Sequence, residues 1–91
     1  MRTIRYTRQF KKDFKRSKRR GKDMEKLKYV VDLLARNQQL ESRFRDHALT
    51  GNFSGMRECH IEPDWLLIYA YAEPDELILI RLGSHADLFK R

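Results

Sequence analysis

The chain opens with a short alternation of polar and apolar side chains, from Thr3 to Tyr6, which predicts a strand. Thr7 follows as a suitable N-cap, and the residues after it predict a helix that ends near Arg20. Phe10 and Phe14 lie four positions apart in this helix, so they share one face and are expected to contact a sheet. Almost every other side chain of the helix is charged, which indicates a position on the surface.

A second helix is predicted by apolar side chains that recur at helical spacing. Gly21 interrupts the first helix, Asp23 can cap the second one, and the pattern ends near Asn37. The apolar positions of this stretch are Met24, Leu27, Val30, Val31, Leu33 and Leu34. We expect them to belong to the core rather than to a cofactor site.

Three further strands at hairpin spacing are predicted in the second half of the chain. A polar, irregular stretch from Asn37 to Phe53 separates them from the helices, and Ser84 to Phe89 can form one helical turn after them. The predicted strands cover about residues 56–61, 66–72 and 77–82. The order β-α-α-β-β-β predicts an α+β fold in which two helices pack on one face of a small, mainly antiparallel sheet.

Two tight turns in this half share the sequence Glu-Pro-Asp but differ in what surrounds them. Glu62-Pro63-Asp64-Trp65 and Glu73-Pro74-Asp75-Glu76 both place Pro at the second position, where its fixed φ suits a type I turn. Only the first turn has a histidine before it, His60, and a tryptophan at its end, Trp65. Because the second turn does without both, His60 and Trp65 indicate a function rather than a requirement of the turn.

The net charge of the chain is +7 at pH 7, and the positive charge is concentrated near the N-terminus. Eleven Lys and Arg side chains in the first 22 residues oppose a single acid, Asp13. A surface of this kind attracts polyanions, most often nucleic acid, by releasing bound counterions, although an acidic protein partner would feel the same field. Charge alone does not separate these partners from an ordinary solvated helix face.

Length, composition and the single cysteine set further bounds. At 91 residues with 41% hydrophobic side chains, the sequence predicts one folded domain over residues 1–91. Cys59 has no partner for an internal disulfide, which favours a reducing compartment, and it adjoins His60, so a thiol nucleophile is an alternative to a plain strand residue. No apolar run reaches the roughly 20 residues that span a bilayer, and no apolar signal core is present, so we expect a cytoplasmic protein without a membrane partner.

The candidate chemistry lies in three histidines and one carboxylate, His47, His60, His85 and Asp64. Histidine gains and loses protons near neutral pH, which suits acid–base catalysis, although each residue taken alone is also explained as a surface or turn residue. RNA can be cleaved by such groups: a base takes the proton of a 2′-hydroxyl, which attacks the neighbouring phosphate, and an acid protonates the departing 5′-oxygen. The same residues would be possible zinc ligands, but no paired spacing such as CxxC or HxxxH supports a metal site, and no metal or other cofactor is expected.

One stretch of the second half is specific enough to compare with known families, namely His60-Ile61-Glu62-Pro63-Asp64-Trp65-Leu66-Leu67-Ile68-Tyr69. Further residues of the same pattern are Asp23, Met24, Lys26 to Tyr29, Asp46, His47, Leu49 to Gly51, Phe53, Gly55, Arg57, Gly83, His85, Leu88 and Phe89. With these residues the chain resembles the YafQ branch of the RelE-type toxins, bacterial mRNA endonucleases of toxin–antitoxin systems. Phe53 and Cys59 depart from the residues usual in that family, and neither removes a proposed catalytic group.

The resemblance implies a ribosome-dependent ribonuclease that cuts mRNA in the decoding site and is silenced by a cognate antitoxin. The implied partners are the antitoxin, mRNA on the ribosome, and ribosomal RNA, which the basic first helix would face. The catalytic residues of the family fall on His47, His60, Asp64 and His85. Its aromatic pair, of which either member would stack on a base, falls on Trp65 and Phe89.

The hypothesis that follows is a metal-independent endoribonuclease. His85 is the proposed general acid, and His60 or Asp64 is the proposed general base, with the acid and base assignments interchangeable. His47 and Arg57 would stabilise the charge of the phosphate.

Two other functions use the same features differently. A ParE-type toxin, directed at gyrase, would use this scaffold to arrest growth without cutting RNA, because fold alone does not decide function. A plain nucleic-acid-binding protein would bind RNA with strongly salt-dependent affinity and no turnover. Three histidines together with Asp64 favour the nuclease, since a pure binder does not need them. The nuclease requires that His47, His60, Asp64 and His85 converge in one cleft.

Overall fold

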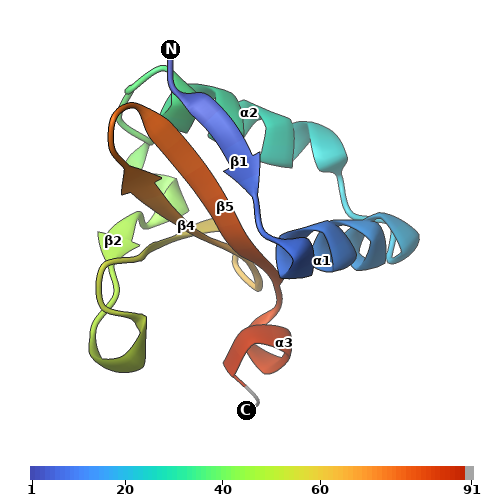
Figure 1. Cartoon of the computed structure of the whole chain (residues 1–91). Helices are drawn as coiled ribbons and strands as arrows, with labels where there is room; N and C mark the ends of the chain where they lie inside the picture. Colours follow the sequence, from blue (N-terminus) through green and yellow to red (C-terminus); the bar gives the residue numbers. More distant parts are fainter. Residues whose placement is uncertain (90–91) are drawn as a thin grey trace.

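The computed structural model describes residues 1–89 and consists of a sheet with helices packed against it (Figure 1). The helices are α1 (Arg8–Arg19), α2 (Met24–Ala35) and α3 (His85–Phe89). The strands are β1 (Thr3–Tyr6), β2 (His47–Ala48), β3 (Arg57–Glu62), β4 (Trp65–Ala72) and β5 (Glu76–Gly83). Single turns of 3-10 helix, Ser42–Phe44 and Gly51–Phe53, flank β2. The predicted α+β order is confirmed, with one strand more than expected.

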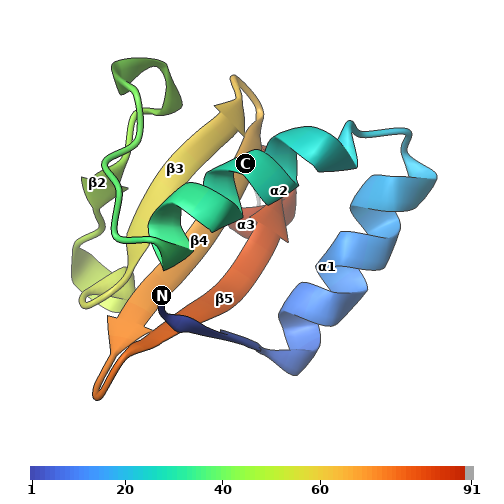
Figure 2. The ribbon, with the colours of Figure 1, turned by 90° about the horizontal axis from the view of Figure 1, so that it is seen from above.

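The five strands form one sheet in the order β1-β5-β4-β3-β2. β1 runs parallel to β5 and all other neighbours are antiparallel, so the sheet is mainly antiparallel, as predicted. Figure 2 shows α2 lying across one face of the sheet, with α1 beside β5 on the same side. α3 packs on the opposite face, which the sequence did not indicate.

The additional strand, β2, lies in the stretch that was expected to be an irregular loop. His47 pairs with Glu58 and Ala48 pairs with Arg57 in antiparallel register. A strand of two residues is too short to show an alternating pattern, so the prediction of a loop was wrong at this point. The pairing with β3 fixes the position of His47.

Both predicted helix caps are present. The Thr7 hydroxyl accepts a hydrogen bond from the Phe10 amide at 2.9 Å, and the Asp23 carboxylate accepts one from the Glu25 amide at 3.1 Å. Phe10 is buried and Phe14 packs beside it, as their spacing predicted. The buried side chains of α2 are Leu27, Val30, Leu34 and Ala35. Within residues 1–89, no helix has the length and apolar character needed to cross a membrane.

Apolar side chains leave β4 on both faces, so the sheet has a core on each side. Trp65, Leu67 and Tyr69 belong to the larger core, which α1 and α2 cover. Leu66 and Ile68 face the other way, into a smaller cluster. The residues that cover this second cluster are Leu49, Phe53, Met56, Ile80, Leu88 and Phe89. The second face, rather than the face under the long helices, carries the three histidines.

Candidate active site

The pairing of β2 with β3 brings two of the histidines together. Side chains alternate between the two faces of a strand, so Glu58 and His60 leave β3 on the same side. His47 lies directly opposite Glu58 in β2 and therefore shares that face. The ring centroids of His47 and His60 are 6.3 Å apart.

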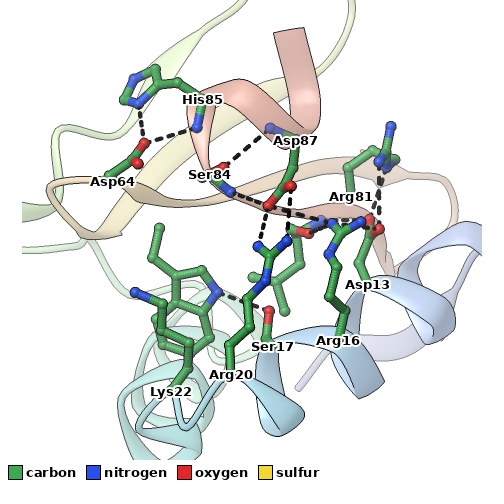
Figure 3. A network of polar contacts seen from close by, with 12 residues as sticks. Asp13, Arg16, Ser17, Arg20, Lys22, Asp64, Arg81, Ser84, His85 and Asp87 are labelled. Atoms are coloured by element: carbon green, nitrogen blue, oxygen red, sulfur yellow. Dashed lines mark hydrogen bonds and ion pairs between the residues drawn. The ribbon is translucent and has the colours of Figure 1, made fainter. Parts of the chain in front are cut away.

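The third histidine, His85, is the first residue of α3, and its ring centroid lies 5.7 Å from that of His60. Asp64, in the turn between β3 and β4, holds it in place. One carboxylate oxygen of Asp64 accepts a hydrogen bond from the His85 backbone N–H at 2.8 Å and lies 2.6 Å from its ring Nδ1 (Figure 3). These two contacts fix the backbone and the ring of His85 at once.

The same contacts set the protonation of the Asp64 carboxyl group. The backbone N–H of His85, and after it the ring, holds the pKa of Asp64 below its usual value of 3.8. An ionised carboxylate can only accept, so the hydrogen of this contact lies on Nδ1 of His85. The Nε2 atom of His85 is therefore the one left for a substrate.

The four predicted groups, His47, His60, Asp64 and His85, therefore converge. The side chain of His60 is 15% exposed, against 49% for His47 and 44% for His85, so His60 is the most enclosed of the three rings. It lies between the other two, within 6.3 Å of each by ring centroid. A row of imidazoles of this kind can both accept and donate protons at a single reacting group.

Glu58 belongs to the site, although the sequence analysis did not select it. Its side chain is 7% exposed, and its Oε1 lies 3.5 Å from Nε2 of His47 and 3.4 Å from Nε2 of His60. The Nδ1 of His47 lies 2.7 Å from the carbonyl oxygen of Arg45, so both nitrogens of this ring face acceptors. The available signal was spacing, because Glu58 stands two positions before His60 in a predicted strand.

A groove of about 740 Å³ opens beside these rings. His60 and His85 lie on its wall, together with Tyr29 of α2 and Arg45 of the segment before β2. Arg45 has a left-handed backbone conformation, with φ of 48°, at the end of the 3-10 turn. No sequence pattern singled out Arg45, because its place beside the histidines depends on the path of an irregular segment.

Of the two aromatic residues expected to stack on a base, only Phe89 lies at the site. Its half-buried ring has its centroid 6.5 Å from that of His85 and packs edge-on against Phe53 at 5.6 Å. Trp65 is 1% exposed and faces the larger core, where its ring N–H donates to the Ser17 hydroxyl at 3.1 Å. A ring without an exposed face cannot stack on RNA, so the expectation for Trp65 was wrong.

Arg57 also lies outside the site. It is the neighbour of Glu58 in β3, so its side chain leaves the sheet on the opposite face. There it donates to Asp46 at 3.1 Å and to the Tyr69 hydroxyl at 3.4 Å, while Tyr69 donates to the other oxygen of Asp46. The bond to Asp46, and after it the bond to Tyr69, raises the pKa of Arg57 above its usual value. The expected phosphate contact of Arg57 does not fit this arrangement.

The cysteine beside the site is a core residue. Cys59 is 0% exposed and belongs to the larger core, on the face opposite His60. Burial, which is the main cause, raises the pKa of its thiol far above the usual value. A thiol nucleophile needs an accessible thiolate, so the structure favours the plain strand role of Cys59.

A family model described as the bacterial toxin YafQ of type II toxin–antitoxin systems matches residues 2–90 of the chain. The chain belongs to the YafQ toxin family. It is 46% identical over 90 residues to the mRNA interferase toxin YafQ of Escherichia coli strain K12, a match that covers 97% of this chain and 96% of that protein. This YafQ-family chain is therefore a homologue of mRNA interferases, which are endoribonucleases.

Solved YafQ structures share the fold as well. The crystal structure of the E. coli DinJ–YafQ complex contains a chain that matches with a TM-score of 0.89 and 44% identity, over 98% of this chain and 99% of that chain. A metal-bound toxin from Helicobacter pylori matches with a TM-score of 0.92 and 42% identity, over 98% of this chain and all of the other. The two N-terminal helices and the mixed, mostly antiparallel sheet are thus the YafQ architecture.

The Helicobacter toxin was solved with a bound metal. Among residues 1–89 of this YafQ-family chain, no group of three His, Cys, Asp or Glu side chains is placed to hold a metal ion. Instead, Asp64 is bonded to His85, and Glu58 lies between the rings of His47 and His60. The carboxylates and imidazoles of the site are paired with one another.

Proposed function

We propose that this YafQ-family toxin is a ribosome-dependent endoribonuclease that blocks translation by cutting mRNA, using the 2′-hydroxyl to attack the adjacent phosphate. The observation that supports it most is the row of His47, His60 and His85 with the carboxylates of Glu58 and Asp64 beside it. These groups supply a base, an acid and positive charge in one place, which are the parts that phosphodiester cleavage requires.

His85 serves as the general acid and His60 as the general base. Asp64 orients the His85 ring through Nδ1, which leaves Nε2 to protonate the departing 5′-oxygen. Asp64 is a weak base because His85 holds its pKa low, and one of its oxygens is already occupied. His60 lies next to His85 and has a carboxylate, Glu58, that can orient its ring while it takes the proton of the 2′-hydroxyl.

Positive charge at the phosphate comes from His47 and Arg45. The Nδ1 of His47 lies 2.7 Å from the carbonyl oxygen of Arg45, and this contact holds the ring at the edge of the site. Arg45 lies on the wall of the same groove as His60. Phe89, beside His85, offers a ring on which a base can stack.

The outer side of α1 provides the contact with ribosomal RNA. The exposed cations of this helix are Arg8, Lys11, Lys12, Lys15, Lys18 and Arg19. Contacts between such side chains and phosphate groups position a protein without reading sequence. The helix therefore brings the site to ribosome-bound mRNA and does not choose the bond that is cut.

Cleavage of mRNA on programmed ribosomes tests this proposal. Toxin stripped of transition metals by chelation and dialysis is expected to cut as well as untreated toxin, because side chains supply the acid and the base. His85→Ala and His60→Ala are each expected to lower the rate by at least about 100-fold. Undiminished cutting by either variant removes that residue from the chemistry. Growth arrest with intact ribosome-bound mRNA would instead support a ParE-type binder on this scaffold.

A cognate antitoxin is the proposed protein partner. The E. coli relative has been solved in the DinJ–YafQ toxin–antitoxin complex, and the +7 charge of this chain favours an acidic binding segment. Co-expression of the toxin with the adjacent open reading frame, followed by affinity capture of the toxin, tests for this partner. The proposed place of action is the cytoplasm, where ribosomes hold mRNA.

A further inference from the structure

The segment that carries His85 is tied to α1 by a chain of polar contacts (Figure 3). α3 has only five residues, and a helix of this length is not stable alone, so its position depends on the rest of the molecule. Asp64 provides one contact from the turn between β3 and β4. The others pass through Asp87, two positions after His85.

Asp87 forms two hydrogen bonds with Ser84 across the first turn of α3. The Ser84 backbone N–H donates to the Asp87 carboxylate at 2.9 Å, and the Asp87 N–H donates to the Ser84 hydroxyl oxygen at 3.1 Å. This reciprocal pair is a capping box. Because His85 lies between its two members, the backbone of His85 is fixed from both sides.

Two arginines, Arg16 of α1 and Arg20 at the C-cap of this helix, hold Asp87 in turn. Arg20 donates to both carboxylate oxygens, at 2.7 and 3.3 Å, and Arg16 lies 3.6 Å from one of them. The hydrogen bond from Arg20 is the main reason that the pKa of Asp87 lies far below its usual value. The contact leaves little room, since a Cβ atom at Gly83 would lie 2.8 Å from the Asp87 Cβ and 3.0 Å from an Arg16 nitrogen. The glycine therefore permits the close approach of α1, β5 and α3.

The arginines that hold Asp87 have a fixed position themselves, because Asp13 anchors α1 to β5. The Asp13 side chain is fully buried and accepts hydrogen bonds from Arg81 Nε at 2.8 Å and from the Leu82 N–H at 3.0 Å. Burial by itself would raise the pKa of Asp13, but these bonds outweigh it and the pKa is lowered. Arg16 donates to the same carboxylate at 3.1 Å, so one arginine joins the anchor to Asp87.

We propose that Asp87 and Arg20 are positioning residues that hold His85 in the place where it acts. The proposal rests on the ribonuclease function proposed above. Asp64 orients the ring of His85, while the Asp87–Arg20 contact sets the helical turn from which that ring projects. Arg20 therefore differs from the exposed cations of α1, because its charge pairs with Asp87 and does not contact RNA.

Kinetics of mRNA cleavage on programmed ribosomes test the role of this contact. Asp87→Asn is expected to lower kcat by about 10-fold and Arg20→Gln by about 3-fold, both at unchanged KM, since a displacement of about 1 Å can cost up to about 100-fold. Arg20→Lys keeps the charge and is expected to recover part of the loss. The control, Arg36→Gln, removes the same charge from an exposed position at the end of α2 and is expected to leave kcat unchanged.

A second measurement does not depend on cleavage. The ring resonances of His85 in ¹H–¹⁵N spectra of the free protein are expected to shift in Asp87→Asn and Arg20→Gln but not in Arg36→Gln. Unshifted resonances in the first two variants overturn the proposal. A raised KM at unchanged kcat in Arg20→Gln also overturns it, because Arg20 would then contact RNA.

The two proposals fail in distinguishable ways. If the wild-type toxin does not cut ribosome-bound mRNA, the ribonuclease function fails, and the His85 resonances still decide whether Asp87 and Arg20 position the ring. If Asp87→Asn does not fold, Arg20→Gln decides alone, because the Arg20 side chain is 49% exposed and its loss creates no cavity.

Discussion

The two Glu-Pro-Asp turns lie at opposite ends of β4, and they are tied into the molecule in different ways. In the second turn, the Asp75 carbonyl accepts from the Thr3 N–H at 2.9 Å, and Glu76 pairs with Arg5 at 3.1 Å. The Glu73–Pro74 peptide bond in this turn is cis. These contacts attach β1 to its neighbour β5, and their side chains are at least partly exposed.

The first turn contacts residues that are central to the site and to the core. Asp64 binds His85 at the start of α3, and Trp65 donates to the buried Ser17 hydroxyl of α1. Glu-Pro-Asp is common to both turns, so the difference comes from the residues beside it and from the elements that pack against each turn. A short motif of this kind identifies a turn, and the tertiary partners decide whether the turn has a function.

The largest expected difference between the two turns is a difference in stability when the last residue of each turn is replaced. Trp65→Ala removes a side chain that is 1% exposed and is expected to lower the free energy of unfolding by about 3–5 kcal/mol. Glu76→Ala removes a carboxylate whose ion pair with Arg5 contributes less than about 1 kcal/mol. Urea unfolding followed by circular dichroism measures both. Equal losses would show that Trp65 is not the core residue described here.

Replacing the aspartates should separate the turns by activity. Asp64→Ala is expected to slow mRNA cleavage by about 100-fold, because the His85 ring loses the acceptor that orients it. Asp75→Ala, the matched change in the other turn, is expected to leave the rate unchanged. Cleavage on programmed ribosomes measures the rates, and thermal unfolding checks that both variants are folded. A slow Asp75→Ala variant would contradict the assignment of function to the first turn alone.

The surface ion pairs of the turns should not distinguish them. Glu62 pairs with Lys26 at 3.1 Å in the first turn, and Glu76 pairs with Arg5 at the same distance in the second. Double-mutant cycles on unfolding are expected to give a coupling below about 1 kcal/mol for each pair, and less at high salt. A much larger coupling for Glu62–Lys26 would mean that the first turn is held by charge as well as by Trp65.

The smallest expected effect is the contribution of ionised Asp64 to stability, which should disappear in acid. His85 lowers the pKa of Asp64, so the folded state favours the ionised carboxylate. The stability that this provides is complete above the usual pKa of 3.8 and is lost as the pH falls through the lower pKa of the folded state. Asp64→Asn is therefore expected to lower Tm near pH 6 and to approach the wild type in acid. A constant difference in Tm between pH 2 and pH 6 would contradict this, and Asp75→Asn controls for the loss of one charge.

The sequence was informative where the signal was local. The caps Thr7 and Asp23, the apolar spacing of α2 and the three long strands were all predictable, because each depends on neighbouring residues. The convergence of the three histidines with Asp64 was expected from a family resemblance and not from spacing. The alternation of side chains along the predicted strand would also have placed Glu58 and Arg57 on opposite faces of the sheet, since adjacent residues of a strand face opposite sides.

Other features could not be predicted from the sequence, because they depend on contacts between residues that are far apart in the chain. The charged pattern of α1 conceals the buried Asp13, whose partner Arg81 belongs to the last strand. The apolar run of β4 is buried on both faces, so alternation does not reveal which side Trp65 takes. The strand β2 consists of two residues and exists only because β3 pairs with it.

The parallel pairing of β1 with β5 has a consequence for how the protein is made. The first strand of the chain, Thr3–Tyr6, has its only partner within residues 1–89 in Glu76–Leu79 of the last strand. A ribosome makes β1 long before it makes β5, and pairing two segments so far apart in the sequence slows folding. His85 follows immediately after. The toxin therefore cannot assemble its site before β5 and α3 have been made, so no active site is present while the earlier elements are being translated.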